Sequence, residues 1–491
     1  MALRLPGATR PRSLRGATIF AAFLSLAALP LVAAARTPPP KPLALTHVTV
    51  IDATGAAAQP NMTVITAGRR IAALGKTGHV RVPKGAQIVD ASGKYLIPGL
   101  WDMHVHFAEI ERSFPLFVAN GVTGVRNMGG NLDDLLRWRR DVDAGRLLGP
   151  RVVLCGPILD GPQPAAQGPT IVVATAAEGR QAVDMLKKRG ADCVKVYDRL
   201  PRDAYYAIVD EAARQGLPVV GHVPLALSSV EASDAGQRSI EHLGNILEGA
   251  STIEAELRRL ESTAEVPSDP SEFPRRLAAR GNRMLDTYDE QKAGKIFSQF
   301  LKNRTWQVPT LEFKWALTFI DAISQRDDAR LKYIPGSERQ WWSPEKNFFS
   351  RYRTPEYIVF KKRLFQKELD LVGAMHRAGV PFLAGTDVSG AYVFPGFSLH
   401  HELELFVQAG FSPLEALQAA TRNPAVFLGE SSSRGTVEPG KVADLVLLAG
   451  NPLTDIRNTQ TIEAVVLSGR YLPKAALAKM LRGVEAAAKA R

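Results

Sequence analysis

Strand-like apolar runs alternate with helix-like segments through the middle of the chain, and this alternation restricts the fold more than any other feature. Eight such runs occur, at residues 102–107, 121–128, 151–157, 193–198, 218–223, 239–244, 308–313 and 382–387. Strands that alternate with helices form parallel sheets, and eight strand–helix units close into a barrel. We therefore expect an α/β fold with a (β/α)8 TIM barrel at residues 99–427, interrupted by insertions at 245–307 and 314–381.

Shorter strand-like runs lie on both sides of this region. Before the barrel, turn residues separate them about every 8–12 positions. After the barrel, "ADLVLLAG" and "IEAVVLSGRYL" are strand-like runs of the same kind. A β unit split between the two ends of a chain implies an inserted middle domain whose own termini lie close together. We expect a small β-sandwich domain built from residues 36–98 and 428–473, followed by a C-terminal helix at 474–491.

The first 35 residues have the organisation of a secretory signal peptide. Four arginines precede an apolar stretch at about residues 19–32, and Ala33, Ala34 and Ala35 follow it. This stretch is shorter than the ~20 residues that span a bilayer, so a retained membrane anchor is the less favoured alternative. We expect a signal peptide at residues 1–35, export to the periplasm or the medium, and no membrane span in the mature chain.

Charge and cysteine content argue against a nucleic-acid-binding protein and a disulfide-rich scaffold. The formal net charge is +12, and removal of residues 1–35, which hold four arginines and no acid, leaves +8. The basic residues are scattered rather than clustered with aromatic residues, so we expect no nucleic-acid partner. The two cysteines, Cys155 and Cys193, lie in apolar strand-like runs. Two cysteines do not make a disulfide scaffold, and we expect buried free thiols.

Histidines and an aspartate stand at the ends of predicted barrel strands. His104 and His106 on the first strand project to the same side, because side chains alternate along a strand. His222 ends the fifth strand, His242 the sixth and Asp387 the eighth. Barrels build active sites at this end, and neutral imidazole is the commonest metal ligand, so we expect a metal site. The remaining histidines are interpreted as surface or packing residues: His47, His79, His376, His400 and His401.

Lys195 lies inside the strand-like run "CVKVYD", where an inward-facing ammonium would be a costly unpaired charge. One interpretation is that its amine points outward between helices and reaches solvent. The other is that carbon dioxide has carboxylated the amine, which gives a carbamate anion able to bridge two cations.

These motifs in this order resemble the amidohydrolase superfamily, in particular its imidazolonepropionase-like and prolidase-like (Xaa-Pro dipeptidase-type) members. The resemblance rests on H-x-H on the first strand, a lysine in mid-barrel, single histidines on strands five and six, and T-D on strand eight. It extends over about residues 43–471 and includes "GVTGVRNMGG", "SIEHLG", "HHELELFVQAGFSPLEALQAATRNPAVFLG" and "GTVEPGKVADLVLLAGNPLTDI".

The resemblance implies a binuclear metal centre. His104 and His106 would bind one metal together with Asp387, and His222 and His242 would bind the other. Carboxylated Lys195 would bridge the two ions. Zinc is the default identity, with Mn, Fe or Co as alternatives. Because imidazolonepropionase uses one metal without the lysine, Lys195 favours the two-metal, prolidase-like branch. One departure is Arg126-Asn127, where relatives often read V-R-D.

The implied activity is hydrolysis of a C–N bond, in a dipeptide or N-acyl amino acid, by metal-activated hydroxide with Asp387 as the proton carrier. A cyclic amide, lactone or phosphoester is an alternative substrate for the same site, and an inactive barrel used as a binding module is the least favoured function. The partner is therefore a small-molecule or short-peptide substrate. The sequence allows a homo-oligomer without indicating one.

Two further residues are candidates for binding the substrate. Tyr197 and Arg126 lie at predicted strand ends and could hold a carboxylate through charge-assisted hydrogen bonds. The insertion after strand seven is rich in aromatic residues, which would either pack it onto the barrel or form an apolar wall over the metals. These are Tyr333, Trp341, Trp342, Phe348, Phe349, Tyr352, Tyr357 and Phe360, with Arg351 and Arg353 among them. We expect a substrate whose leaving group is an amino acid with a free carboxylate and a bulky apolar side chain.

Overall fold

The computed structural model describes residues 41–490, apart from residue 108 and the segments 263–271, 348–349, 351–352 and 389. The expected signal peptide lies outside the described residues. Within them, no helix combines the length and the apolar content needed to cross a bilayer.

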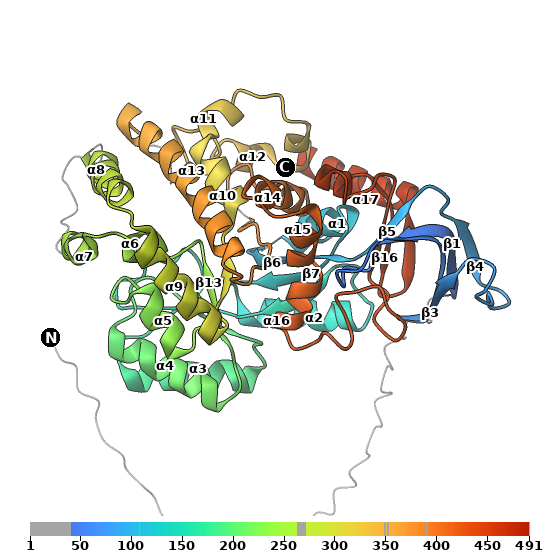
Figure 1. The fold of residues 1–491 in the computed structure, drawn as a ribbon, viewed down its shortest axis with the longest axis horizontal. Coiled ribbons are helices and arrows are strands. Elements are labelled where there is room, and N and C mark those ends of the chain that lie inside the picture. The colour runs from blue at the N-terminus through green and yellow to red at the C-terminus, as the bar shows by residue number, and fades with distance from the viewer. Residues whose placement is uncertain are drawn as a thin grey trace, which may run out of the picture. The chain divides into compact units, whose positions relative to one another are not determined.

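Strands from both ends of the chain form one eight-stranded sheet. Its strands are β1 (Leu43–Val50), β2 (Gln59–Ala67), β3 (Arg70–Lys76), β4 (Gln87–Asp90), β5 (Tyr95–Pro98), β15 (Leu445–Leu448), β16 (Ile462–Leu467) and β17 (Arg470–Pro473). The order is β17-β16-β15-β5-β1-β2-β3, with β4 paired to β1. β5 and β15 join the two halves as antiparallel neighbours, and Figure 1 shows β1 and β16 in the same part of the molecule. Both ends of the chain thus contribute strands to one hydrogen-bonded sheet, and its sandwich form stays a prediction.

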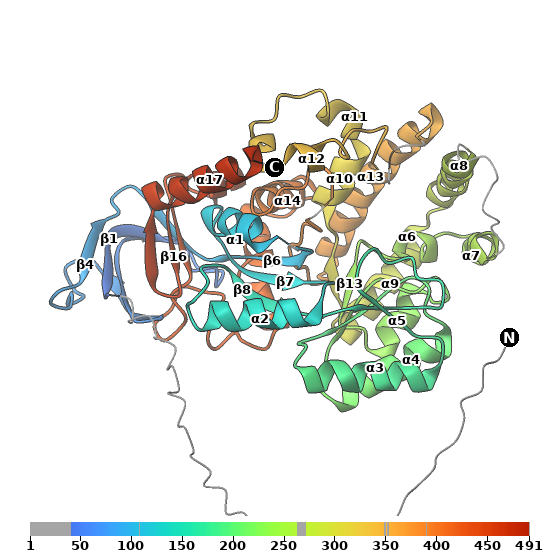
Figure 2. The same cartoon turned by 180° about the vertical axis from the view of Figure 1, so that it is seen from behind.

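The middle of the chain forms two parallel sheets. The first contains β6 (Leu100–Val105), β7 (Val122–Asn127) and β8 (Arg151–Leu154). The second has the order β10-β9-β11-β12-β13-β14, from β9 (Ile158–Asp160), β10 (Thr170–Val172), β11 (Val194–Val196), β12 (Val219–Gly221), β13 (Ser239–Glu241) and β14 (Trp306–Val308). Six of these strands match predicted barrel strands. The seventh, β14, shares only Val308 with the predicted strand 308–313, because a helix begins at Leu311 inside that run; β9 and β10 were not predicted. Figure 2 shows β6, β7 and β8 with helix α2 (Leu132–Asp143) beside them.

The two parallel sheets meet at two places, which gives an α/β fold of TIM-barrel type. At one, single parallel bridges join Gln307 to Phe382 and Val105 to Val388, so the segment predicted as the eighth strand links β14 to β6. At the other, which we call the β8–β11 seam, Asp192 N donates to Leu154 O at 2.8 Å. No strand ladder joins β8 to β11 in the described part of the chain.

Helices connect the parallel strands, and several have strong local end signals. In α3 (Ala176–Arg189), Thr175 and Glu178 form a reciprocal capping box, and Gly190 ends the helix in the left-handed conformation. The other connecting helices are α1 (Ile110–Ala119), α4 (Arg202–Arg214), α5 (Ser229–Ala235), α14 (Phe397–Gln408), α15 (Pro413–Ala419) and α16 (Arg422–Phe427). The terminal helix α17 (Lys474–Lys489) follows β17 and contacts α1.

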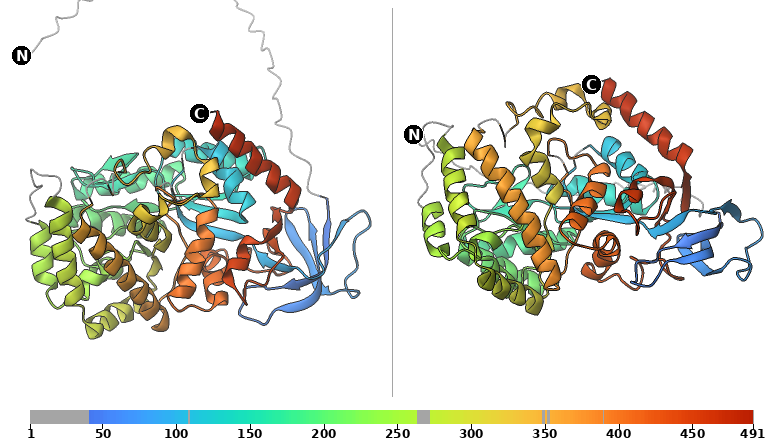
Figure 3. Two further views of the ribbon diagram at one scale, coloured as in Figure 1. Left: turned by 90° about the horizontal axis from the view of Figure 1, so that it is seen from above. Right: turned by 45° about the horizontal axis from the view of Figure 1, so that its top comes forward.

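The two predicted insertions are helical and contact each other. The first contains α6 (Ile246–Gly249), α7 (Glu254–Ser262), α8 (Glu272–Asp286) and α9 (Glu290–Asn303). The second contains α10 (Leu311–Thr318), α11 (Ile320–Ile323), the 3-10 helix η1 (Ala329–Tyr333), α12 (Gly336–Arg339) and α13 (Pro355–Arg377); a second 3-10 helix, η2 (Ile456–Gln460), precedes β16. Figure 3 shows the yellow-green and orange helices of the insertions near one another, and α8 packs on α13.

The expectation of free thiols is wrong, because Cys155 and Cys193 form a disulfide. Cys155 directly follows β8 and Cys193 directly precedes β11, so the fold brings them to a Cα–Cα distance of 4.5 Å, although 38 positions separate them in sequence. A cross-link that closes a loop of this size typically stabilises a fold by roughly 2–4 kcal/mol. The sequence could not reveal the pairing, since it does not show which strand edges are neighbours.

The barrel and the terminal sheet approach closely at Gly121. This residue has φ +74°, and a Cβ added to it would lie 2.9 Å from a methyl carbon of Val446 in β15. Gly429 has a similar φ of +71°, but an added Cβ there would meet no atom within 4 Å.

We expect Gly121→Ala to lower the free energy of unfolding by roughly 1–3 kcal/mol more than Gly429→Ala, because only the first substitution adds a steric clash to the backbone strain. Chemical denaturation of the two variants measures the difference. Equal losses of unfolding free energy in the two variants would show that Val446 moves aside without destabilising the fold.

Candidate metal centre

The four histidines and the aspartate predicted from strand ends converge in the structure. His104 lies in β6 and His106 just after it, while His222 and His242 follow β12 and β13. His104 Nε2 and His106 Nε2 each lie 3.4 Å from Asp387 Oδ1, and His242 Nε2 lies 3.9 Å from Asp387 Oδ2. The ring centroid of His222 is 4.8 Å from that of His242. The sequence therefore identified side chains that share one site.

Hydrogen bonds to Nδ1 orient three of the four rings. The pairs are His104 with Glu241 Oε2 at 2.8 Å, His222 with Asp198 Oδ1 at 2.8 Å, and His242 with Thr310 Oγ1 at 2.7 Å. A carboxylate accepts the Nδ1–H of His104 and of His222. Thr310 donates its own proton to Pro309 O, so its oxygen accepts from His242. With Nδ1 protonated, each Nε2 has a free lone pair, as metal ligation requires.

Asp387 is held as an anion at the centre of this group. Burial alone would raise the pKa of its carboxyl, but the neighbouring rings of His104, His242 and His106 hold that pKa well below its ordinary value. The backbones of Asp387 and His242 have φ of +57° and +58°, which is uncommon for residues other than glycine. Such backbone strain persists where surrounding structure fixes it, often at functional sites.

Lys195 points into the same site rather than outward between helices. It is 1% exposed, it lines the same cavity as His106 and Asp387, and Nζ has no hydrogen-bond partner among the described residues. Burial lowers the pKa of its ammonium to about 8, which increases the fraction of neutral amine. The neutral amine is the form that reacts with carbon dioxide.

The residues present fit a divalent metal. His104 Nε2 is, like Lys195 Nζ, buried without a hydrogen-bond partner in the described chain, and both are atoms that the predicted centre would use. One ligand atom each from His104, His242 and Asp387 lie within 4.8 Å of one another. Imidazole nitrogens with a carboxylate oxygen are a donor set that suits zinc and similar ions.

Arg126 does not face the cavity, so that part of the prediction is wrong. It is fully buried, and its Nη2 pairs with Glu241 at 2.9 and 3.1 Å while Nε donates to Met103 O at 2.6 Å. Burial would raise the pKa of Glu241, but the Arg126 guanidinium and His104 hold it at about 2. Arg126 therefore keeps Glu241 ionised as the acceptor for His104.

Glu241 is one of three site residues that the sequence analysis missed, with Asp198 and Thr310. It stands directly before His242 in "SIEHLG" and is fully buried. A carboxylate in a buried strand next to a predicted metal ligand was an available signal. Its partner His104 lies 137 positions away, so the contact itself could not be read from the sequence.

A cavity of about 920 Å³ opens over the site, lined by Tyr197 together with His106, Lys195, His222, His242 and Asp387. Tyr197 stacks on His222 with ring centroids 3.9 Å apart. The other aromatic side chains that line the cavity are Phe107, Trp138, Phe313 and Trp342. Of these, only Trp342 belongs to the aromatic residues that were predicted to do so.

Of the aromatic residues expected in the second insertion, only Trp342 lines the cavity among those described. Tyr333 is buried against Phe397, and the Phe360 ring occupies the space beside Gly281. Trp341 is 60% exposed. Arg353 pairs with Asp321 and with backbone carbonyls, while Phe348, Phe349, Arg351 and Tyr352 lie outside the described residues.

Comparisons with known proteins agree with this architecture. Residues 347–472 match the model of the amidohydrolase family, whereas a search of curated proteins finds no match. A candidate prolidase from Bifidobacterium longum is similar in structure, with 25% identity, a TM-score of 0.63, and coverage of 91% of this chain and 100% of that one. A bottromycin amidohydrolase has 22% identity, a TM-score of 0.69, and coverage of 91% of each chain. A Xaa-Pro dipeptidase with bound methionine has 20% identity, a TM-score of 0.62, and coverage of 88% and 100%.

We expect Glu241→Gln to lower the free energy of unfolding by roughly 3–5 kcal/mol, because the buried Arg126 guanidinium loses its counter-ion. The double substitution Glu241→Gln with Arg126→Met should recover part of that loss, since it removes both charges. Denaturation of the metal-free protein measures both effects. A loss within about 1 kcal/mol for the single variant is typical of an exposed ion pair and would contradict this account of the pair.

Proposed function

We propose that this chain, whose residues 347–472 match the amidohydrolase family model, is a metal-dependent hydrolase of the amidohydrolase superfamily that cleaves an amide or peptide bond in a dipeptide or N-acyl amino acid. The observation that carries the proposal is the convergence of histidine Nε2 atoms on the Asp387 carboxylate beside a buried, unpartnered lysine, at the base of a cavity of about 920 Å³. A cavity of this size accommodates small molecules and short peptides.

In this proposal two divalent ions, zinc by default, occupy the site. His104 and His106 hold one with Asp387, His222 and His242 hold the other, and carboxylated Lys195 bridges them. Ions bound there would supply a hydroxide at neutral pH and polarise the scissile carbonyl. The unpartnered Nε2 of His104 and Nζ of Lys195 support this assignment.

Asp387 is the residue that moves the proton. Its Oδ1 faces His104 and His106 and its Oδ2 faces His242, so the carboxylate reaches the centre of the ligand group. It can accept the proton of the attacking water and deliver it to the leaving nitrogen. Because its pKa is held well below the ordinary value, it is ionised and ready to accept before the reaction begins.

Tyr197 is the proposed contact for the substrate carboxylate, a role that Arg126 cannot share. Burial raises the pKa of the Tyr197 phenol above its ordinary value, so the hydroxyl remains a hydrogen-bond donor. Phe107, Phe313 and Trp342 give the same cavity apolar surface for a bulky side chain. Among the structural relatives, one prolidase was crystallised with N-methylphosphonate-L-proline, which supports a substrate of this size. A cyclic amide, lactone or phosphoester remains the alternative substrate for the same site.

Lys195→Ala should abolish most activity, and short carboxylic acids should restore part of it by replacing the carbamate as the bridging anion. The control is Lys188→Ala, which removes an exposed lysine and should neither lose activity nor respond to the acids. Rates with and without added formate or acetate measure the effect. Wild-type activity in Lys195→Ala would show that the lysine is no ligand.

Asp387→Asn should lower kcat by about 10²–10⁴-fold, because it removes the proton carrier and keeps the side-chain volume. Circular dichroism and the thermal midpoint establish that the fold is retained. A rate within about tenfold of the wild type would contradict the assigned role.

An N-acyl aromatic amino acid should be hydrolysed with a kcat/KM at least about tenfold higher than its C-terminal amide, because only the acid forms a charge-assisted hydrogen bond. Tyr197→Phe should narrow this ratio without removing hydrolysis. Equal kcat/KM values for acid and amide in the wild type would refute recognition of a free carboxylate.

A further inference from the structure

The ligands of the proposed metal centre are divided between two sheets. His104 lies in β6 of the sheet β6-β7-β8 and His106 directly follows it. Lys195 lies in β11 of the other sheet, and His222 and His242 directly follow its strands β12 and β13. Each sheet is held internally by parallel strand pairing. A centre that needs all of these ligands therefore depends on how the two sheets are fixed to each other.

The chain itself crosses from the first sheet to the second, since β9 begins four residues after β8 ends and pairs with β11. Between β8 and β11 themselves, the described residues form few noncovalent links. Asp192 N donates to Leu154 O at 2.8 Å, and Leu154 N donates to Asp192 Oδ2 at 2.9 Å. Arg139 adds an ion pair with Asp192 at 2.8 Å, but the Asp192 side chain is 39% exposed, so this pair contributes little. The opposite junction is held by the segment that carries Asp387 itself.

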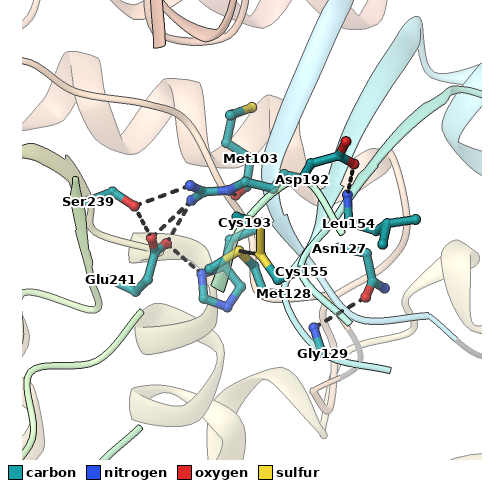
Figure 4. Close-up of a disulfide and its surroundings, with 12 residues drawn as sticks. Met103, Asn127, Met128, Gly129, Leu154, Cys155, Asp192, Cys193, Ser239 and Glu241 are labelled. Carbon is teal, nitrogen blue, oxygen red and sulfur yellow. Dashed lines mark hydrogen bonds and ion pairs between the residues drawn. A yellow bond between two sulfur atoms is a disulfide. The ribbon is translucent and has the colours of Figure 1, made fainter. Parts of the chain in front are cut away.

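The Cys155–Cys193 disulfide crosses this seam in the buried interior. Figure 4 shows it beside Met128, close to the group that contains Ser239 and Glu241. Cys155 and Cys193 are 0% and 2% exposed. The covalent link therefore joins the end of β8 to the start of β11 at a point that solvent does not reach.

The disulfide acts close to Lys195. Cys193 stands two residues before Lys195, and side chains at i and i+2 of a strand share a face. On the other side, Gly221 of β12 leaves room for the lysine, since a Cβ there would lie 2.8 Å from Lys195 Cδ. The stem of Lys195 is thus confined by β12 on one side, and its strand is tethered to β8 on the other.

We propose that the Cys155–Cys193 disulfide is a positioning cross-link that holds the two halves of the metal centre in register, with Lys195 as the ligand most directly dependent on it. The inference rests on the proposed function. Reduction by a dithiol would transfer two electrons and two protons to the sulfur atoms, break the S–S bond to give two thiols, and oxidise the reductant to its own disulfide. The cross-link agrees with the expected export, because disulfides persist in oxidising compartments.

The first measurement is peptide mapping of the purified native protein without reductant. A peptide pair linked through Cys155 and Cys193 is expected. Two thiols that both react with an alkylating reagent on denaturation would overturn the proposal outright.

The second measurement compares Cys155→Ala/Cys193→Ala with Val153→Ala, a control that removes side-chain volume from the same apolar cluster and keeps the cross-link. Competition with a chromophoric chelator gives the zinc affinity. We expect the double variant to bind zinc about 10- to 100-fold more weakly than the wild type, which is the loss typical when residues that orient metal ligands are changed. The Val153→Ala control should bind zinc like the wild type. The 13C signal of carbamate on Lys195 should weaken in the double variant alone. If that variant does not fold, Cys155→Val/Cys193→Ala refills part of the volume without the link and should show the same loss.

Hydrogen exchange separates failure of this inference from failure of the proposed function. In the metal-free double variant, the amides of Leu154 and Asp192 should exchange faster than in the wild type, whatever the chain catalyses. If the wild type binds no metal and cleaves no amide, the proposed function fails. The exchange rates of the Leu154 and Asp192 amides then still show whether the disulfide holds β8 and β11 together. Unchanged exchange, or zinc affinity in the double variant within about twofold of the control, would overturn the positioning role.

Discussion

A buried lysine amine that has no hydrogen-bond partner among the described residues is the constraint on which this site depends. A buried unpaired ammonium is costly, and the surroundings of Lys195 lower its pKa to about 8. Carboxylation would convert the amine into an anion, but Asp387 and Glu241 already place negative charge nearby. An added anion is stable there only if cations accompany it. In the proposed centre, the carbamate and a pair of divalent ions would therefore require each other, and the histidines lie where they could hold such ions.

The orientation of the proposed ligands comes from a second layer of polar residues, of which Glu241, Thr310 and Arg126 are buried and Asp198 is partly exposed. Glu241, Asp198 and Thr310 each fix one imidazole through Nδ1, and Arg126 keeps Glu241 ionised. Asp102 adds a similar contact, since it accepts hydrogen bonds from the backbone and hydroxyl of Thr386, next to Asp387. Partners of this kind set the tautomer and direction of each ligand, which is why they matter almost as much as the ligands.

The sequence predicted which of these side chains come together, because the information is local and periodic. Alternation along a strand places His104 and His106 on one side, and parallel strand order brings the ends that carry His222, His242 and Asp387 to one face. What the sequence could not supply is contact between distant strands. Arg126 has the chemistry of a carboxylate-binding residue. However, it forms a buried ion pair with Glu241, 115 positions away, and does not face the cavity.

The same limit explains the other differences. The cysteines were interpreted as free thiols because nothing in their local sequence shows that β8 and β11 are neighbours. The aromatic residues 333–360 were expected to wall the cavity, but of those described only Trp342 does so. Phe107, Trp138 and Phe313 line the cavity from other positions. The pairing of β5 with β15, which joins the strands from the two ends of the chain, is again a long-range contact that the local sequence does not show.

The central claim is that one buried group of side chains on several strands assembles a two-ion centre, and metal stoichiometry tests it most directly. Protein stripped of metal with a chelator should be titrated with zinc in bicarbonate buffer, with bound metal and amide hydrolysis followed together. The account predicts saturation at two ions per chain, with full activity reached only at the second. Full activity at one ion per chain, with no second binding event, would contradict it.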